Sequence, residues 1–157
     1  MSHLRLLTLA SSLCLLLAFG GVGCSKNDPS SFAVTLSAAN EVPPTTSPAT
    51  GTATFVLNGD ATVQYRIEVH SMTSITGAHI HSGGPTATGP VRVTLFAGPT
   101  TGAIDGELAQ GTFDASDVVG ISFDTLLDEM RDGMAYVNVH TTDNPNGEIR
   151  GQVRLEQ

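Results

Sequence analysis

The pair His79 and His81, separated by one residue, is the feature of this sequence that points most directly to chemistry. In an extended strand, alternate side chains project from the same face, so both imidazoles are expected on one face, roughly 7 Å apart. Two imidazoles placed in this way can bind one metal ion. His140 ends another alternating segment and is the best third ligand. His70 also follows an alternating segment, but its place in such a site is less secure.

The type of ligand narrows the choice of metal. Three imidazoles without a thiolate suit copper or zinc, because calcium and magnesium prefer shells of oxygen ligands. Copper is the first choice for an exported protein and zinc the second. The alternation also predicts that none of these histidines is a core residue. A purely structural role stays open, since histidines at strand ends often bind loop carbonyls or carboxylates and fix a turn.

Motifs for catalysis are missing from the sequence. No serine or cysteine nucleophile lies in a recognisable local motif. Gly83 and Gly84 follow the histidine pair in an expected turn, without the helix that a phosphate-binding loop needs. The sequence therefore predicts a binding module and no enzymatic activity.

The elements that must position the histidines are short strands with period-two alternation between turn residues. The expected strands are Phe32 to Leu36, Thr52 to Leu57, Thr62 to Val69, Val91 to Phe96, Ala135 to His140 and Glu148 to Leu155. Each is expected to have one core face and one polar face, as in antiparallel sheets that are covered on a single side.

One segment has helical spacing. Ser122 can cap a helix that runs to Arg131, in which Leu126, Leu127 and Met130 make one apolar stripe, and Gly133 can end it. We expect this helix to pack across an open end of the sheet. Together, the elements predict an all-β fold, an antiparallel Greek-key sandwich or barrel of immunoglobulin-like or superoxide-dismutase-like type, with one short helix.

A turn is expected at Asn144-Pro145-Asn146-Gly147, because Asn-Gly readily adopts positive φ and closes hairpins. It joins the strand that ends at His140 to the strand that carries Glu148 and Arg150. These two side chains share a face by alternation, where we expect an ion pair that clasps the structure.

The N-terminal segment is typical of export. Arg5 precedes an apolar run that is too short to span a membrane, and small residues lead to Cys24. The segment is similar to a bacterial lipobox, although Gly21 stands where leucine is usual, so cleavage without a lipid stays open. We expect a signal peptide at 1–23, a lipidated cysteine and tether at 24–31, and one domain at 32–157.

Composition limits the partners. Removal of the signal peptide leaves Cys24 as the only thiol, so the domain has no internal disulfide. It also removes only Arg5 from the seven basic residues, leaving six against fifteen acidic ones, a net charge of −9. This excess of carboxylates argues against nucleic acid as a partner and against contact with an anionic membrane surface, so membrane contact is expected only through the lipid. The location expected is the cell envelope, on the periplasmic or extracellular side.

Three motifs in order resemble the CHRD domain, the family named after chordin. They are Leu36-Ser37-Ala38-Ala39-Asn40-Glu41-Val42-Pro43-Pro44, then Ile75-Thr76-Gly77-Ala78-His79-Ile80-His81-Ser82-Gly83 with Gly89-Pro90-Val91, and last Ala135-Tyr136-Val137-Asn138-Val139-His140-Thr141-Thr142 with Asn144-Pro145-Asn146-Gly147-Glu148-Ile149-Arg150-Gly151. The resemblance implies an immunoglobulin-like or Greek-key β fold outside the cytoplasm, without an established activity for the family as a whole.

Three functions are compatible with these observations. The first is a non-catalytic module that binds a transition-metal ion through His79, His81 and His140. The second is a structural or adhesive module that binds an envelope or extracellular protein. The third, the least supported, is a copper-dependent redox enzyme, suggested by a partial similarity of the His-X-His strand to copper/zinc superoxide dismutase.

Overall fold

The computed structural model describes residues 31–59 and 62–156. The expected signal peptide, Cys24 and the tether before Ser31 lie outside the described residues. Neither described helix is long and apolar enough to cross a membrane.

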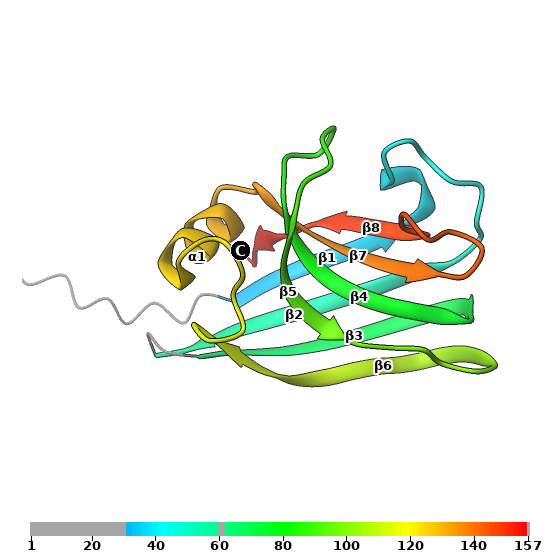
Figure 1. Ribbon diagram of the computed structural model, residues 1–157, viewed down its shortest axis with the longest axis horizontal. Coiled ribbons are helices and arrows are strands. Elements are labelled where there is room, and N and C mark those ends of the chain that lie inside the picture. Colours follow the sequence, from blue (N-terminus) through cyan, green and yellow to red (C-terminus); the bar gives the residue numbers. More distant parts are fainter. Residues whose placement is uncertain (1–30, 60–61, 157) are drawn as a thin grey trace, which may run out of the picture.

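Nine strands, one α-helix and one short 3₁₀ helix make up the described chain (Figure 1). They are β1 (Ser31–Ser37), η1 (Ala38–Asn40), β2 (Thr50–Asn58), β3 (Thr62–Thr73), β4 (Ile75–Ser82), β5 (Val91–Phe96), β6 (Ala103–Asp114), α1 (Phe123–Arg131), β7 (Ala135–Thr141), β8 (Ile149–Gln152) and β9 (Arg154–Leu155).

All strand pairs are antiparallel, in the order β5-β4-β7-β8-β1-β2-β3-β6, with β9 paired to β1. Consecutive strands β3 and β4 do not pair, and neither do β6 and β7, so the chain crosses over twice. The two end strands, β5 and β6, contact each other, and the Tyr65 hydroxyl on β3 donates a hydrogen bond to the Leu95 carbonyl on β5 at 2.7 Å. The sheet is therefore a nearly closed barrel, and the predicted all-β antiparallel fold is confirmed.

The alternation predicted for the first strands is confirmed by burial. In β2 every second residue is buried, and Val63, Ile67 and Val69 of β3 are fully buried. Phe32 of β1 and Phe55 of β2 are directly paired in the ladder, and both have an exposed fraction of 0%. These apolar side chains fill the interior of the barrel.

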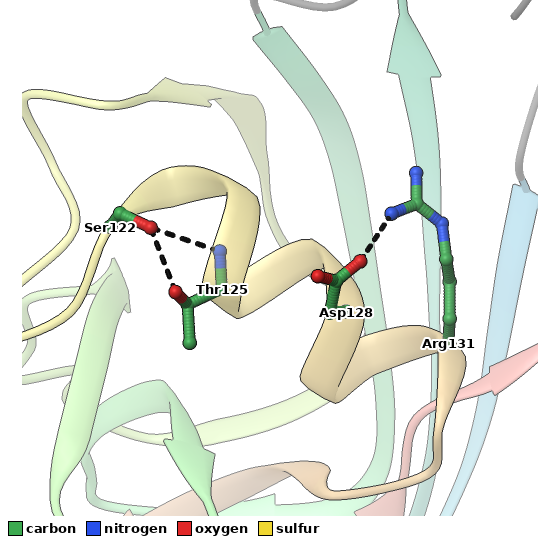
Figure 2. A network of polar contacts seen from close by, with 4 residues as sticks. All are labelled: Ser122, Thr125, Asp128 and Arg131. Carbon is green, nitrogen blue, oxygen red and sulfur yellow. Dashed lines mark hydrogen bonds and ion pairs between the residues drawn. The ribbon is translucent and has the colours of Figure 1, made fainter.

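The helix also forms where the sequence predicts it. Ser122 adopts an extended conformation and its Oγ accepts a hydrogen bond from the Thr125 amide at 3.1 Å, as the N-cap of α1 (Figure 2). The stripe Leu126, Leu127 and Met130 is buried. The helix packs against β7 and β9 and lies at one end of the sheet in Figure 1.

Two parts of the strand prediction are wrong. Strand β6 was not expected. Its alternation is broken by a bulge, because Ile67 and Glu68 of β3 pair with Ala109 and Glu107, which leaves Leu108 without a partner. The predicted strand from Glu148 to Leu155 is two strands, since β8 pairs with β7 whereas β9 pairs with β1.

The expected turn before β8 forms, with Gly147 at φ 133° and its amide donating to the Asn144 carbonyl at 3.0 Å. The expectation of an ion pair between Glu148 and Arg150 is wrong. The Glu148 carboxylate instead accepts from the hydroxyls of Ser47 and Thr141. Arg150 binds backbone carbonyls, so each residue fixes a different loop.

Candidate metal centre

Strands β4 and β7 position three histidines on one face of the sheet. His79 pairs with Asn138 in the ladder, and His140 pairs with Gly77, so the three imidazoles lie on adjacent strands within two residues of each other. Their neighbours Ile80, Val137 and Val139, with the opposite orientation, lie in the core. The alternation of the two strands thus separates the cluster from the apolar interior.

The three rings lie close together. The ring centroids are 5.8 Å apart for His79 and His81, 5.0 Å for His79 and His140, and 6.0 Å for His81 and His140. Each ring offers one nitrogen such that the three nitrogens lie within 4.8 Å of one another. A metal with nitrogen ligands at about 2.0–2.1 Å needs these atoms roughly 3.3–3.6 Å apart, so small side-chain rotations bring them onto one ion.

Hydrogen bonds define which nitrogen two of the three rings offer. The Nδ1 atom of His81 lies 2.9 Å from the Gly89 carbonyl, and that of His140 lies 3.0 Å from the Pro145 carbonyl. Since a carbonyl only accepts, both Nδ1 atoms carry the proton, and in a neutral ring Nε2 then bears a lone pair. Both Nε2 atoms and Nδ1 of His79 are buried without a hydrogen-bond partner among the described residues.

The environment keeps these rings neutral. Burial, followed by the proximity of His140 and His81, lowers the pKa of His79 to about 4. Burial also lowers the pKa of His81 and of His140, although the hydrogen bonds to Gly89 and Pro145 oppose the effect. Neutral imidazoles are the form that binds metal, and they are present at neutral pH without competition from protons.

One expectation about these strands is wrong. His81 is buried, with 8% of its surface exposed, and so are Tyr136 and Asn138 on the face of β7 that was predicted to be polar and open. The reason is that two loops cover this face: the connection from β1 to β2, and the connection from β4 to β5 (Figure 1). Alternation predicts the direction of a side chain and not what covers it.

Arg150 fixes the β4–β5 loop onto the sheet. Arg150 is 1% exposed, and its guanidinium carbon Cζ lies 3.4 Å from the centre of the Tyr136 ring. Its Nη2 donates to the carbonyls of Gly84 and Ala87, both at 2.8 Å. Tyr136 in turn stacks on His81, with ring centroids 4.9 Å apart and planes at 10°. This arrangement holds His81 in one orientation.

Glu41 fixes the β1–β2 loop on the other side. Both of its carboxylate oxygens accept hydrogen bonds from Nδ2 of Asn138, at 3.0 and 3.2 Å. Burial raises its pKa to about 7, against the opposing effects of Arg150, the Val42 amide and Asn138. Glu41 also lines a groove of about 880 Å³, which β1, β8 and β9 border. It therefore contacts both this groove and the strand that carries His140.

His70 is not part of the cluster. It lies on β3, exposed, and its Nδ1 bonds to the Asp105 carboxylate at 2.5 Å. Sequence reasoning had treated its membership as less secure than that of the other three. It had missed Glu41 and Arg150 as supporting residues, although both lie within the motifs quoted for the family resemblance.

Three neutral imidazoles that lie close together, two of them braced through their other nitrogen, define a β domain with a candidate transition-metal centre. Residues 32–153 match the family model described as the CHRD domain. The chain therefore belongs to the CHRD family. A comparison with curated proteins found no match.

Proposed function

We propose that this protein is an exported, lipid-anchored module that binds one copper ion, or zinc as second choice, through His79, His81 and His140, without catalysing a reaction. One observation supports this function best. Each of the three rings has one buried nitrogen that binds no other described residue, and each ring offers a nitrogen within 4.8 Å of those of the other two. A buried polar atom without a partner costs about 1–3 kcal/mol, so three together are best accounted for by a shared cation.

The hydrogen bonds that His81 and His140 make at Nδ1 also support a metal. In metal sites, a ligating histidine usually donates its other N–H to a carbonyl or carboxylate, which fixes the ring and its tautomer. His81 and His140 both donate to backbone carbonyls. A cluster that served only to brace turns would need these two hydrogen bonds, but not the convergence of the opposite nitrogens.

Metal titration of the chain from Ser31 onward tests the proposal, since the hydrophobic core of the described residues runs from Phe32 to Val153. Cuprous ion, under anaerobic conditions, cupric ion and zinc are added to the wild type, to the double variant His79→Ala/His140→Ala, and to His70→Ala. The wild type and His70→Ala are expected to bind one ion per chain, because His70 lies outside the cluster. Unchanged binding in the double variant would sink the site.

The non-catalytic part of the proposal has its own test. A copper-loaded sample is assayed for superoxide dismutation against the free ion and against the apo protein. The expected result is stoichiometric binding with no turnover above that of the free ion. Turnover that vanishes in His79→Ala/His140→Ala would replace the binding module with a redox enzyme.

Export and lipid anchoring rest on the sequence alone. The full chain is expressed in a bacterial host with a Cys24→Ala variant beside it. The wild type is expected to partition into detergent and to carry an N-terminal diacylglyceryl mass, whereas the variant stays in the aqueous phase. Aqueous partition of both would favour plain secretion.

A further inference from the structure

Asn138 is a buried polar residue with an unmatched oxygen. Only 3% of its surface is exposed, and it pairs directly with His79 across the β4–β7 ladder. Its Oδ1 atom is buried and has no hydrogen-bond partner among the described residues. Directly opposed side chains on one face of an antiparallel pair have Cβ atoms roughly 4.5–5.5 Å apart, so this oxygen belongs to the neighbourhood of His79.

Glu41 determines which way the Asn138 amide points. Nδ2 of Asn138 lies 3.0 and 3.2 Å from the two Glu41 oxygens. The ionised form of Glu41 accepts hydrogen bonds and donates none, so it holds the NH₂ group of the amide on this side. The oxygen of the same amide then faces away from Glu41. The orientation is thus a consequence of hydrogen bonding, not a free choice of rotamer.

Within residues 31–59 and 62–156, four buried side-chain atoms lack a partner. They are Nδ1 of His79, Nε2 of His81, Nε2 of His140 and Oδ1 of Asn138. All four belong to one face of β4 and β7. The hydrogen bonds at Nδ1 leave a lone pair on Nε2 of both His81 and His140. Oδ1 of Asn138 also bears lone pairs, and Nδ1 of His79 bears one in the tautomer that carries its proton on Nε2. A hydrogen bond from the His79 ring to Asn138 would have satisfied two of them, but none is formed.

We propose that Oδ1 of Asn138 is the fourth donor atom of the metal centre, which then consists of three imidazole nitrogens and one amide oxygen. This inference rests on the proposed function. An oxygen donor favours the divalent ions Cu²⁺ and Zn²⁺ over Cu⁺, which prefers softer ligands. Glu41 acts as a positioning residue, because it orients the amide and places a carboxylate near the bound charge.

The test compares variants of the chain from Ser31 onward. Asn138→Ala removes the oxygen. The double variant Glu41→Gln/Asn138→Asp exchanges amide and carboxylate, so the hydrogen bond between the two side chains reverses while an oxygen and the total charge are kept. Tyr65→Phe is the control, since it removes a partly buried side-chain hydrogen bond, to the Leu95 carbonyl, from a residue of β3 that lies outside the strands of the cluster.

Three readouts are taken: Zn²⁺ affinity by competition with a chromophoric chelator, Cu⁺ affinity under anaerobic conditions, and the electron paramagnetic resonance spectrum of the Cu²⁺ form. In Asn138→Ala, we expect Zn²⁺ affinity to fall about 10- to 100-fold, Cu⁺ affinity to change far less, and the Cu²⁺ spectrum to shift. The exchange variant should recover Zn²⁺ binding, and Tyr65→Phe should behave as the wild type.

Two results would overturn the inference. One is Zn²⁺ affinity within about twofold of the wild type in Asn138→Ala with an unchanged Cu²⁺ spectrum. The other is an equal loss of Zn²⁺ and Cu⁺ without recovery in the exchange variant, which indicates a structural role. If Asn138→Ala does not fold, the exchange variant decides by its Zn²⁺ affinity and spectrum. Failure of the wild type to bind any of the ions would instead refute the proposed function.

Discussion

In two histidines of the cluster, the two ring nitrogens have different surroundings. In His81 and His140, Nδ1 binds a loop carbonyl and Nε2 faces the cluster. The two roles that the sequence left open, bracing a turn and binding a metal, are therefore compatible in one residue. They also reinforce each other, because the bond at Nδ1 fixes the tautomer that leaves Nε2 unprotonated.

Gly77 provides the room that the His79 ring occupies. A Cβ at this position would lie 3.0 Å from Cε1 of His79 and 3.4 Å from the Phe96 carbonyl. Gly77→Ala is therefore expected to displace the ring and weaken Zn²⁺ binding by about tenfold, the scale of a disturbed metal shell. The matched control is Gly84→Ala, whose Cβ would meet only Met134 at ordinary contact distances. Equal affinities in the two variants, measured by chelator competition, would contradict this role of Gly77.

The cluster also makes the stability of the apo protein depend on pH. The pKa of His79 is lowered from 6.5 to about 4 on folding, so its contribution to stability is complete above about pH 6.5 and is lost as the pH falls toward 4. The pKa of Glu41 is raised from 4.5 to about 7, so its contribution has the opposite sign: it is complete below about pH 4.5 and is lost as the pH rises toward 7.

Glu41→Gln should reveal how the histidines alone change the free energy of unfolding as the pH falls. Between pH 6.5 and 4.5, the two contributions offset each other in the wild type, whereas the variant keeps only the loss due to the histidines. We expect a steeper fall in the free energy of unfolding for Glu41→Gln, measured by urea denaturation in the presence of a chelator. Parallel pH profiles for the two proteins would show that Glu41 does not titrate as described.

The sequence predicted that the three histidines of the cluster would lie together, but not what surrounds them. Period-two alternation placed His79 and His81 on one face, and the end of a strand identified His140. It did not reveal that Glu41, nearly one hundred residues before Asn138, would bind that side chain. Contacts of such long range depend on how loops fold over the sheet, which local patterns do not encode.

Helix α1 is a short element whose stability depends on its N-cap and on its packing. It has nine residues, fewer than an isolated helix needs to be stable in water, and its buried stripe holds it against the barrel. The Ser122 hydroxyl satisfies the Thr125 amide in the first turn (Figure 2). The Asp128–Arg131 pair at the other end is exposed and contributes little.

Removal of the cap should lower the stability of the whole domain. Ser122→Ala is expected to cost about 1 kcal/mol, because one amide in the first turn loses its partner, whereas Ser122→Asp should be close to neutral. Asp128→Ala serves as a control and is expected to change stability by less than about 0.5 kcal/mol. Urea denaturation followed by far-ultraviolet circular dichroism measures all three. A loss in Asp128→Ala as large as in Ser122→Ala would contradict this assignment.

Strand β6 explains where element prediction failed. Gly106 and Gly111 interrupt its apolar pattern, and the bulge at Leu108 shifts its alternation by one residue. Most of its side chains are exposed or half-buried, so the sequence carries little hydrophobic signal there. By contrast, β2 alternates without interruption and was predicted from its sequence. The alternation of a regularly paired strand can be predicted from its own sequence. The position of a bulge also depends on the partner strand.

At the scale of the whole molecule, a ligand that binds only the folded state must stabilise it. Zn²⁺ at 100 times its dissociation constant is expected to add about 2.7 kcal/mol, and to raise Tm by roughly 10 °C for a domain of this size. Zinc is chosen because it is not redox-active. His79→Ala/His140→Ala should show no zinc-dependent shift, while His70→Ala should shift as the wild type does. Calorimetry with and without zinc gives the comparison.

The hydrogen bonds from His81 to Gly89 and from His140 to Pro145 affect the rate at which a bound ion would be released, as well as its affinity. The loop that binds a ring must move before that ring can turn away from the cluster. The lifetime of a bound ion would then be set by the opening rate of these loops, and not by the strength of the metal–nitrogen bonds alone. A bound ion would in turn slow amide hydrogen exchange in both loops, although neither supplies a ligand.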